Sequence, residues 1–208
     1  GSTVLITRNK HHNIQGNGTD PVGNFVQFRV VQNSTIEVSW NEIVNEYNKS
    51  NPEDVISLYH SSNAWIHDNY IQGHFRPGNG PGSSQNTITL DGYGGSGQPV
   101  SNNRIEGNIL VRTLSIAVFP TSTGPASNNV FANNRVVNAG YLDDGVTRNY
   151  YGYQGMHVLA GGSGNHAHGN TLGTMRGTSQ GSYARGNDGA FEGAPEGGHR
   201  RREHREVA

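Results

Sequence analysis

The chain has 208 residues, of which 32% are hydrophobic and 30 are glycine, and its formal net charge at pH 7 is −1. This length suits one domain, and the near-zero charge argues against a broad electrostatic field for nucleic acid. The chain has no cysteine, which excludes disulfides and thiolate chemistry, and it has no apolar run of about 18 residues that would cross a membrane. No signal peptide is visible.

Short stretches of alternating apolar and polar residues recur along the chain. Residues 51–73 hold two of them, 55–59 and 64–71, separated by a polar turn at 60–63. A period of two predicts β-strands, and strands this short need further copies to bury their apolar side. Similar stretches predict coils in the following order: the end of a coil at 3–11, then 25–43, 51–73, 87–110, 114–137 and 156–172.

An asparagine recurs inside these stretches, three residues after one apolar residue and two before the next. The positions that share this place are Asn9, Asn41, Asn69, Asn108, Asn134 and Asn170. Repeats of roughly 20–50 residues predict a solenoid or a propeller, and strands this few and short favour a parallel β-helix. Within it, we expect the asparagines to bond neighbouring backbone at turns.

The stretch DVISLYHSSNAWIHDNYIQG at 54–73, and QNTITLDGYGGS after it, resemble repeats of the pectate-lyase-like superfamily. The resemblance covers residues 3–173. It implies an all-β fold, a single-stranded right-handed parallel β-helix of about five or six coils, in a domain at 1–173. The superfamily includes polysaccharide lyases, glycoside hydrolases, epimerases, phage tailspikes and proteins of no known activity, so the resemblance implies fold more strongly than function. Residues 174–208 are rich in glycine and charge and predict a flexible tail.

Alternation predicts two outward columns on the first strand of each coil. One column contains Gln27, Ser57, Thr89, Ala117 and His157, and the other contains Arg29, Tyr59, Asp91, Phe119 and Leu159. Stacked strands lie about 4.8 Å apart, so we expect Arg29 and Asp91 about 10 Å apart with Tyr59 between them. His60 follows Tyr59 at the strand end and is expected to extend this exposed strip.

The strip suggests β-elimination on a uronate polymer, which needs a base for the proton beside the carboxylate and a positive group for the developing charge. Tyr59 or His60 is the candidate base. Arg29, or a Ca²⁺ ion held by Asp91, is the candidate charge stabiliser. Substrate contacts are expected from side chains in or near the columns, namely Gln27, Tyr93, Phe119 and His157.

Other activities have weaker support in the sequence. Hydrolysis needs two suitably spaced carboxylates, and only Asp54 and Asp91 lie near this face, with Asp54 expected to cap its turn. A non-catalytic carbohydrate-binding or structural module remains the alternative to a lyase. A polysaccharide partner implies a secreted protein, with no nucleic acid or membrane partner.

Two histidine sites have ordinary interpretations. We expect His67 to be a solvated surface residue on the second strand. His166 and His168 have the spacing of a metal-binding pair, but a metal site needs further ligands, and histidine in a polar, glycine-rich segment is usually only polar.

Overall fold

The computed structural model describes residues 1–16, 23–75, 86–92, 97–114, 116–119, 125–147, 156–158, 163–173 and 189–190. Within these ranges the protein is all β and contains no helix. The strands are β1 (Ser2–Thr7), β2 (Lys10–His12), β3 (Val26–Arg29), β4 (Ser34–Ser39), β5 (Glu42–Val44), β6 (Ile56–Tyr59), β7 (Ala64–His67), β8 (Tyr70–Gln72), β9 (Ile88–Asp91), β10 (Val100–Ser101), β11 (Arg104–Glu106), β12 (Ile109–Val111), β13 (Ile116–Phe119), β14 (Ala126–Ser127), β15 (Val130–Ala132), β16 (Arg135–Val137), β17 (Met156–Val158), β18 (His166–His168), β19 (Thr171–Leu172) and β20 (Gly189–Ala190).

These strands form three large sheets. The five-stranded sheet has the order β17-β13-β9-β6-β3, the six-stranded sheet β19-β16-β12-β8-β5-β2, and the seven-stranded sheet β1-β4-β7-β11-β15-β18-β20. A fourth sheet pairs β10 with β14. All pairings are parallel except that of β18 with β20.

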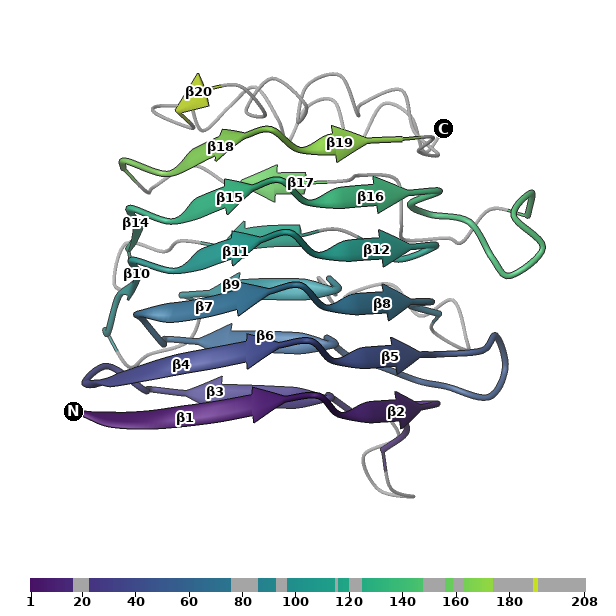
Figure 1. Cartoon of the computed structure of the whole chain (residues 1–208), viewed down its shortest axis with the longest axis horizontal. Helices are drawn as coiled ribbons and strands as arrows, with labels where there is room; N and C mark the ends of the chain where they lie inside the picture. The colour runs from purple at the N-terminus through teal and green to yellow at the C-terminus, as the bar shows by residue number, and fades with distance from the viewer. Residues whose placement is uncertain are drawn as a thin grey trace.

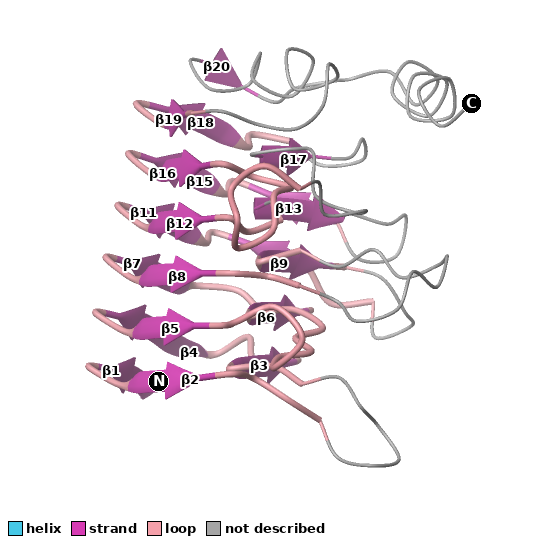
Figure 2. Ribbon diagram, turned by 90° about the vertical axis from the view of Figure 1, so that its right-hand side faces the viewer, coloured by secondary structure: helices cyan, strands magenta, loops and turns pink. Residues whose placement is uncertain are grey.

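The chain visits the large sheets in a fixed order. It passes from the five-stranded to the seven-stranded and then the six-stranded sheet, as in β3-β4-β5 and β6-β7-β8, and we call each such passage a layer. The layers stack from β1 and β2 at one end to β18 and β19 at the other (Figure 1). Seen from the side, strands of one sheet lie one above another (Figure 2).

The core lies between the sheets and is built by residues that alternate inward. The alternation in the sequence predicts ten buried apolar residues, and nine of them are at most 1% exposed: Ile56, Leu58, Ile66, Ile71, Ile88, Leu90, Ile105, Ile116 and Phe131. The tenth, Val118, lies on β13, but its side chain is outside the described part. The prediction of stacked parallel strands with this buried set is therefore confirmed wherever side chains are described.

The second apolar stretch of each repeat divides into two strands. Between β7 and β8, Asp68 has a φ of 53°, and Arg8, Trp40 and Asn133 occupy the same place in their layers with φ of 56–57°. This left-handed residue turns the chain from the seven-stranded to the six-stranded sheet. The sequence had shown residues 64–71 as a single apolar stretch.

The predicted asparagine row follows directly after this turn. The Asn69 backbone N–H donates to Asn108 Oδ1 at 3.1 Å, and its side-chain amide donates to the same oxygen at 2.9 Å and to Val38 O at 2.8 Å. The backbone N–H of Asn41 donates to Asn69 Oδ1 in the same way. The pattern continues through the row Asn9, Asn41, Asn69, Asn108, Asn134 and Asn170. From Asn41 to Asn170 each amide thus bonds backbone of a neighbouring layer, as predicted, whereas Asn9 at the end of the row bonds Thr7 O of its own layer.

Two further rows of this kind were not predicted. One joins Asn103, Asn129 and Asn165 at the entrance to the seven-stranded sheet. In the other, before the five-stranded sheet, the Asp54 N–H donates to Asn24 Oδ1 and the Asn86 N–H donates to Asp54 Oδ1. A carboxyl group therefore stands where the neighbouring layers have an amide.

The predicted tail at 174–208 lies outside the described residues, β20 excepted.

Candidate functional site

The outer face of the five-stranded sheet carries the two columns that the sequence predicted. Arg29 pairs with Tyr59, Tyr59 with Asp91, and Asp91 with Phe119. In the second column, the partners in order are Gln27, Ser57, Thr89, Ala117 and His157. The strand spacing separates Arg29 from Asp91 by about 10 Å at the backbone. The predicted register of both columns is confirmed across the strands described.

The first column combines a cation, a phenol and a carboxylate. Arg29 is exposed, whereas Tyr59 and Asp91 are partly buried. The Arg29 guanidinium carbon lies 5.6 Å from the centre of the Tyr59 ring, within range of a cation–π contact. This contact places the positive group beside the phenol on a surface that a polymer can reach.

His60 does not belong to the exposed strip, contrary to the prediction. Its φ of 47° ends β6, and the side chain is completely buried. Nδ1 lies 2.9 Å from Gln98 O, and the imidazole meets the Tyr59 ring edge-on at 4.8 Å. The left-handed turn takes His60 out of the strand's alternation, so it supports Tyr59 from inside the protein. A buried imidazole cannot serve as a base that meets a polymer on this face.

Among the described side chains of the second column, Gln27 alone is exposed. Ser57 and Thr89 are 1% and 2% exposed, although both alternate away from the core. Asp54 lies beside them and is also buried. Burial raises the pKa of the Asp54 carboxyl to about 7, although the hydrogen bond from the Asn86 N–H lowers it. The carboxyl of Asp54 accepts this backbone hydrogen bond from the neighbouring layer, so its role in capping its own turn stays a prediction, and its burial is new.

A second buried titratable group lies close to Asp54. Burial lowers the pKa of the His74 imidazole to about 4, against hydrogen bonds to the backbone of Glu53 and Pro52, which raise it. Nδ1 lies 3.3 Å from Thr87 Oγ1. The sequence did not single out His74, because its short flanking segment has no strand period.

The remaining predicted substrate residues are only partly described. Tyr93 lies outside the described residues. Phe119 and His157 occupy their predicted places on β13 and β17, but their side chains lie outside the described part. Their contacts with substrate therefore stay predictions.

Metal ligands do not cluster in the part of the chain that the structure describes. It contains no group of three or more His, Cys, Asp or Glu side chains placed to hold an ion. Asp91 would bring at most its own carboxylate to a Ca²⁺ ion, which takes six to eight oxygen ligands. His166 and His168 are exposed, with ring centres 5.3 Å apart.

The outer face of the seven-stranded sheet differs from its prediction at His67. This residue is 6% exposed and not solvated, because the Trp65 ring stacks on it with centres 3.7 Å apart and an interplanar angle of 23°. His67 points away from the core, as alternation requires. The prediction missed that Trp65, two residues earlier on the same face, would cover it.

Comparisons with known proteins return no relatives. No protein-family model matches the chain, and no curated protein or solved structure matches it significantly. The described residues include no helix that is long and apolar enough to cross a membrane.

Proposed function

We propose that the layers belong to a right-handed parallel β-helix of about five or six coils, of the pectate-lyase-like kind. The in-register parallel sheets and the asparagine row support this proposal. Connections between parallel strands of one sheet are right-handed in nearly all proteins, which supports the handedness.

On this fold, we propose a polysaccharide lyase that cleaves a uronate polymer on the outer face of the five-stranded sheet. The observation that carries the proposal is the in-register column of Arg29, Tyr59 and Asp91, with Arg29 exposed beside the Tyr59 ring. A polymer laid along this column would meet a positive charge next to a group able to exchange a proton.

The reaction assigns one step to each group. Tyr59, as its phenolate, takes the proton next to the uronate carboxylate. The electron pair left behind forms the carbon–carbon double bond, and the glycosidic oxygen leaves with the electrons of its own bond and takes a proton from water. Arg29 stabilises the negative charge that develops on the carboxylate. Asp91 binds the sugar. If a Ca²⁺ ion were bound, Asp91 would contribute one carboxylate ligand and the ion would share the stabilisation of charge.

Substrate contacts in this proposal extend along the face. Gln27 is exposed at one end of the second column and provides an amide for sugar hydroxyls. Tyr93, Phe119 and His157 retain their proposed contacts with the polymer. Such a substrate lies outside cells, so the proposal includes secretion.

The test is ultraviolet absorbance of unsaturated products after incubation with a panel of uronate polysaccharides, with and without Ca²⁺. We expect absorbance to rise for at least one polymer, and to rise much more slowly with Arg29→Ala and Tyr59→Phe. Activity that survives both changes would remove the chemistry from this face.

A non-catalytic carbohydrate-binding module is the second candidate. The burial of His60 favours it, because Tyr59 is then the one candidate base left among the described residues of the strip. Binding of a uronate polymer without unsaturated product, and its loss in Arg29→Ala, would identify this function.

A further inference from the structure

Both tryptophans of the chain are exposed, one on the outer side of the seven-stranded sheet and the other at the turn where a strand of that sheet ends. Trp65 on β7 is 41% exposed, and Trp40, at the turn after β4, is 57% exposed. Large aromatic side chains usually bury most of their surface, and exposed ones at a common place mark binding surfaces. This face is distinct from the column of Arg29, which lies on another sheet.

Trp65 is held firmly although it is exposed. One side of its ring stacks on His67, and the guanidinium carbon of Arg104, its neighbour on β11, lies 5.9 Å from the ring centre. Arg104 Nη2 in turn donates to Glu106 Oε2 at 2.8 Å. The indole is therefore ordered before any ligand arrives, which lowers the entropy that binding would cost.

His67 anchors this arrangement from below. Nδ1 lies 2.9 Å from Asp68 Oδ2, and Nε2 lies 3.3 Å from Glu37 Oε1. The hydroxyl of Ser39 donates to the same Glu37 oxygen at 2.7 Å. Carboxylates near both ring nitrogens hold the imidazole in place, so it offers the Trp65 ring a fixed surface to stack on.

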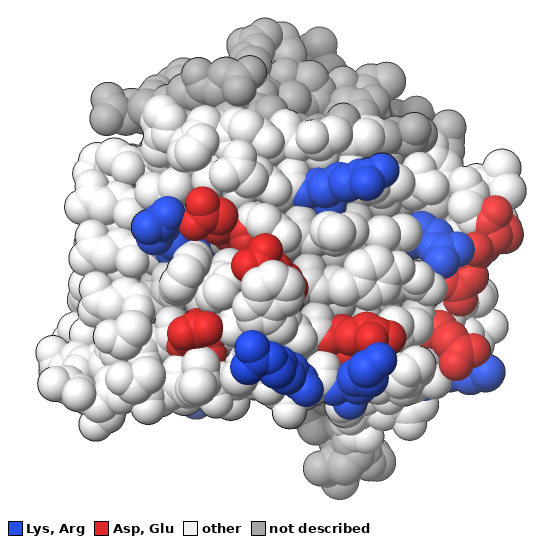
Figure 3. Space-filling model, in the orientation of Figure 1, with Lys and Arg blue, Asp and Glu red and all other residues white. Residues whose placement is uncertain are grey.

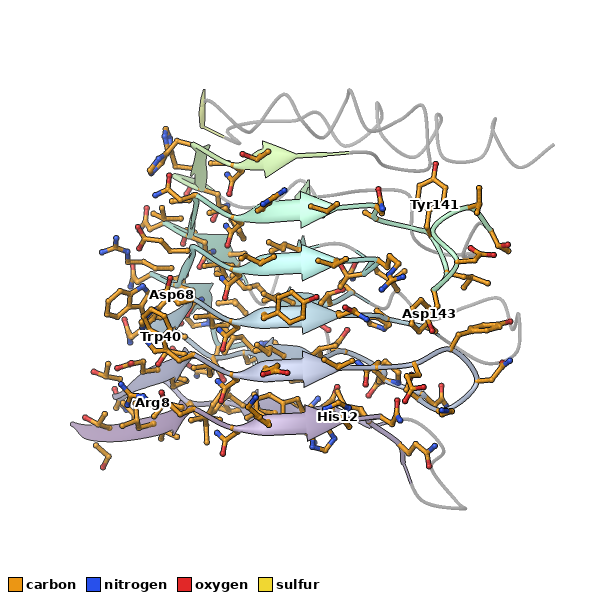
Figure 4. The ribbon with its side chains drawn as sticks, turned by 45° about the vertical axis from the view of Figure 1, so that its right-hand side comes forward. Arg8, His12, Trp40, Asp68, Tyr141 and Asp143 are labelled. Carbon is orange, nitrogen blue, oxygen red and sulfur yellow. The ribbon has the colours of Figure 1, made fainter. Side chains whose placement is uncertain are left out.

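Trp40 lies one layer away at the neighbouring turn. It has a φ of 57°, and Figure 4 shows it between Arg8 and Asp68, which occupy the same turn in the adjacent layers. Glu37 pairs with Trp65, so the backbone of Trp40 lies three residues beyond that pairing, about 10 Å along the strand and about 4.8 Å across it. Two indoles attached at backbone positions this far apart suit two sugar rings of one chain.

The charges around the indoles select the ligand. Carboxylates of Glu37, Asp68 and Glu106 lie around Trp65, and the Arg104 guanidinium is engaged by Glu106. Arg8 occupies the turn next to Trp40 and is the cation that Figure 4 labels there. Figure 3 shows acidic and basic side chains interspersed over this face. Carboxylates accept hydrogen bonds from sugar hydroxyls but repel uronates.

We propose that Trp40, Trp65, His67 and Arg104, the tryptophan platform, bind a neutral polysaccharide chain. The indoles stack on the apolar faces of its sugar rings, and the surrounding carboxylates accept hydrogen bonds from its hydroxyls. The platform is a binding site only, separate from the chemistry proposed for the five-stranded sheet. It would hold the protein on neutral polymers that accompany an acidic substrate.

The test is gel electrophoresis of the whole protein through soluble neutral polysaccharides, namely a β-glucan, a xylan and a galactomannan, with polygalacturonate as the acidic comparison. We expect at least one neutral polymer to retard the protein. Trp40→Ala and Trp65→Ala should each weaken this binding roughly tenfold, from the loss of one stacked ring.

Three control variants distinguish binding at the platform from binding elsewhere on the protein. Tyr47→Ala removes a ring that is also 41% exposed and packs edge-on against Phe75, and it should leave binding unchanged. Arg29→Ala should also leave neutral-polymer binding unchanged, whether or not lyase activity exists. Trp65→Phe keeps an aromatic ring in case Trp65→Ala fails to fold, and it should retain part of the binding.

The proposal is overturned if no neutral polymer retards the protein. Retardation that persists in a Trp40→Ala, Trp65→Ala double variant would overturn it too. Self-association that these two changes abolish, measured by sedimentation in the absence of sugar, would instead identify the face as a contact between protein chains.

Discussion

The outer faces of the five-stranded and seven-stranded sheets are built from the same repeat, yet they hold their side chains differently. On the first, the exposed guanidinium of Arg29 lies against the Tyr59 ring in a cation–π contact that crosses from one layer to the next. On the second, His67 is tied to Glu37 and Asp68, and the Trp65 ring stacks on His67 and lies near the Arg104 guanidinium. The outer face of the five-stranded sheet suits side chains that move when a substrate binds. The outer face of the seven-stranded sheet suits a rigid binding surface.

The largest expected effect tests the chemistry assigned to the first face. Arg29→Ala and Tyr59→Phe should each lower turnover of a uronate polymer by about 10²–10⁴-fold, because each removes a charge stabiliser or a base. Both side chains point outward, so the melting temperature should change little. Asp91→Asn should remove a Ca²⁺ requirement together with activity, or weaken only substrate affinity.

Initial rates by ultraviolet absorbance, with melting curves for each variant, make this measurement. Trp65→Ala is the control from the other face and should keep full turnover on a soluble substrate. If Trp65→Ala lowers turnover as much as Arg29→Ala does, the two faces are not functionally separate.

The next effect concerns pH and the buried pair behind the first face. The pKa of Asp54 rises from 3.8 in the unfolded chain to about 7, so the stability it contributes is full below pH 4 and is lost as the pH rises through 7. The pKa of His74 falls from 6.5 to about 4, so its contribution is full above pH 6.5 and is lost as the pH falls through 4. Between pH 4 and 6.5 the two effects oppose each other.

In the parent protein the two pH dependences of stability partly cancel, so single substitutions should reveal each of them. Asp54→Asn should be more stable than the parent at pH 8 by about 3–4 kcal/mol, with little difference near pH 3. His74→Gln should remove the loss of stability toward pH 4. Denaturant unfolding from pH 3 to 8 measures both, and parallel pH curves for parent and variants would contradict the pKa shifts.

A smaller effect tests the asparagine row that both faces share. Asn69→Ala should destabilise the protein by about 1–3 kcal/mol, because the backbone groups bonded by the amide lose buried partners. Polysaccharide binding should not change in the folded variant. Asn33→Ala, at an exposed position, is the control and should be near neutral. Unchanged stability with altered ligand binding would show that Asn69 acts in a binding site.

The smallest effect is expected at Gly107, a turn residue that lies next to Asp68 and so next to the tryptophan platform. Gly107 has a φ of 65°, and an added Cβ would lie 2.9 Å from Asp68 Oδ1, so Gly107→Ala should displace the carboxylate that holds His67. We expect a loss of about 1–2 kcal/mol from the left-handed backbone, together with weaker neutral-glycan binding.

Gly145→Ala is the matched control, because Gly145 has a φ of 71° and open space around its Cβ position. The Gly145→Ala variant should lose only the stability that a left-handed backbone costs an alanine. Equal glycan binding by the two variants would show that Asp68 does not position the platform.

Much of the architecture was readable in the sequence because it repeats. The alternation at Ile56, Leu58, Ile88 and Leu90 predicted which side chains point inward, and this also predicted that Arg29, Tyr59 and Asp91 share a column. Stacked layers leave little freedom in register, since a slip by one residue would expose every core side chain. The row through Asn69 was predictable for the same reason.

Burial on the outer faces was decided only by the tertiary structure. Alternation determines which way His67 points, but its burial comes from the Trp65 ring and from carboxylates of Glu37 and Asp68. His60 is not part of the predicted strip, because its own left-handed backbone ends β6. Asp54 is a buried carboxyl group within a row of asparagines. The sequence determined direction and register, which are local and periodic, whereas exposure and pKa depend on neighbours that only the stacking of layers brings together.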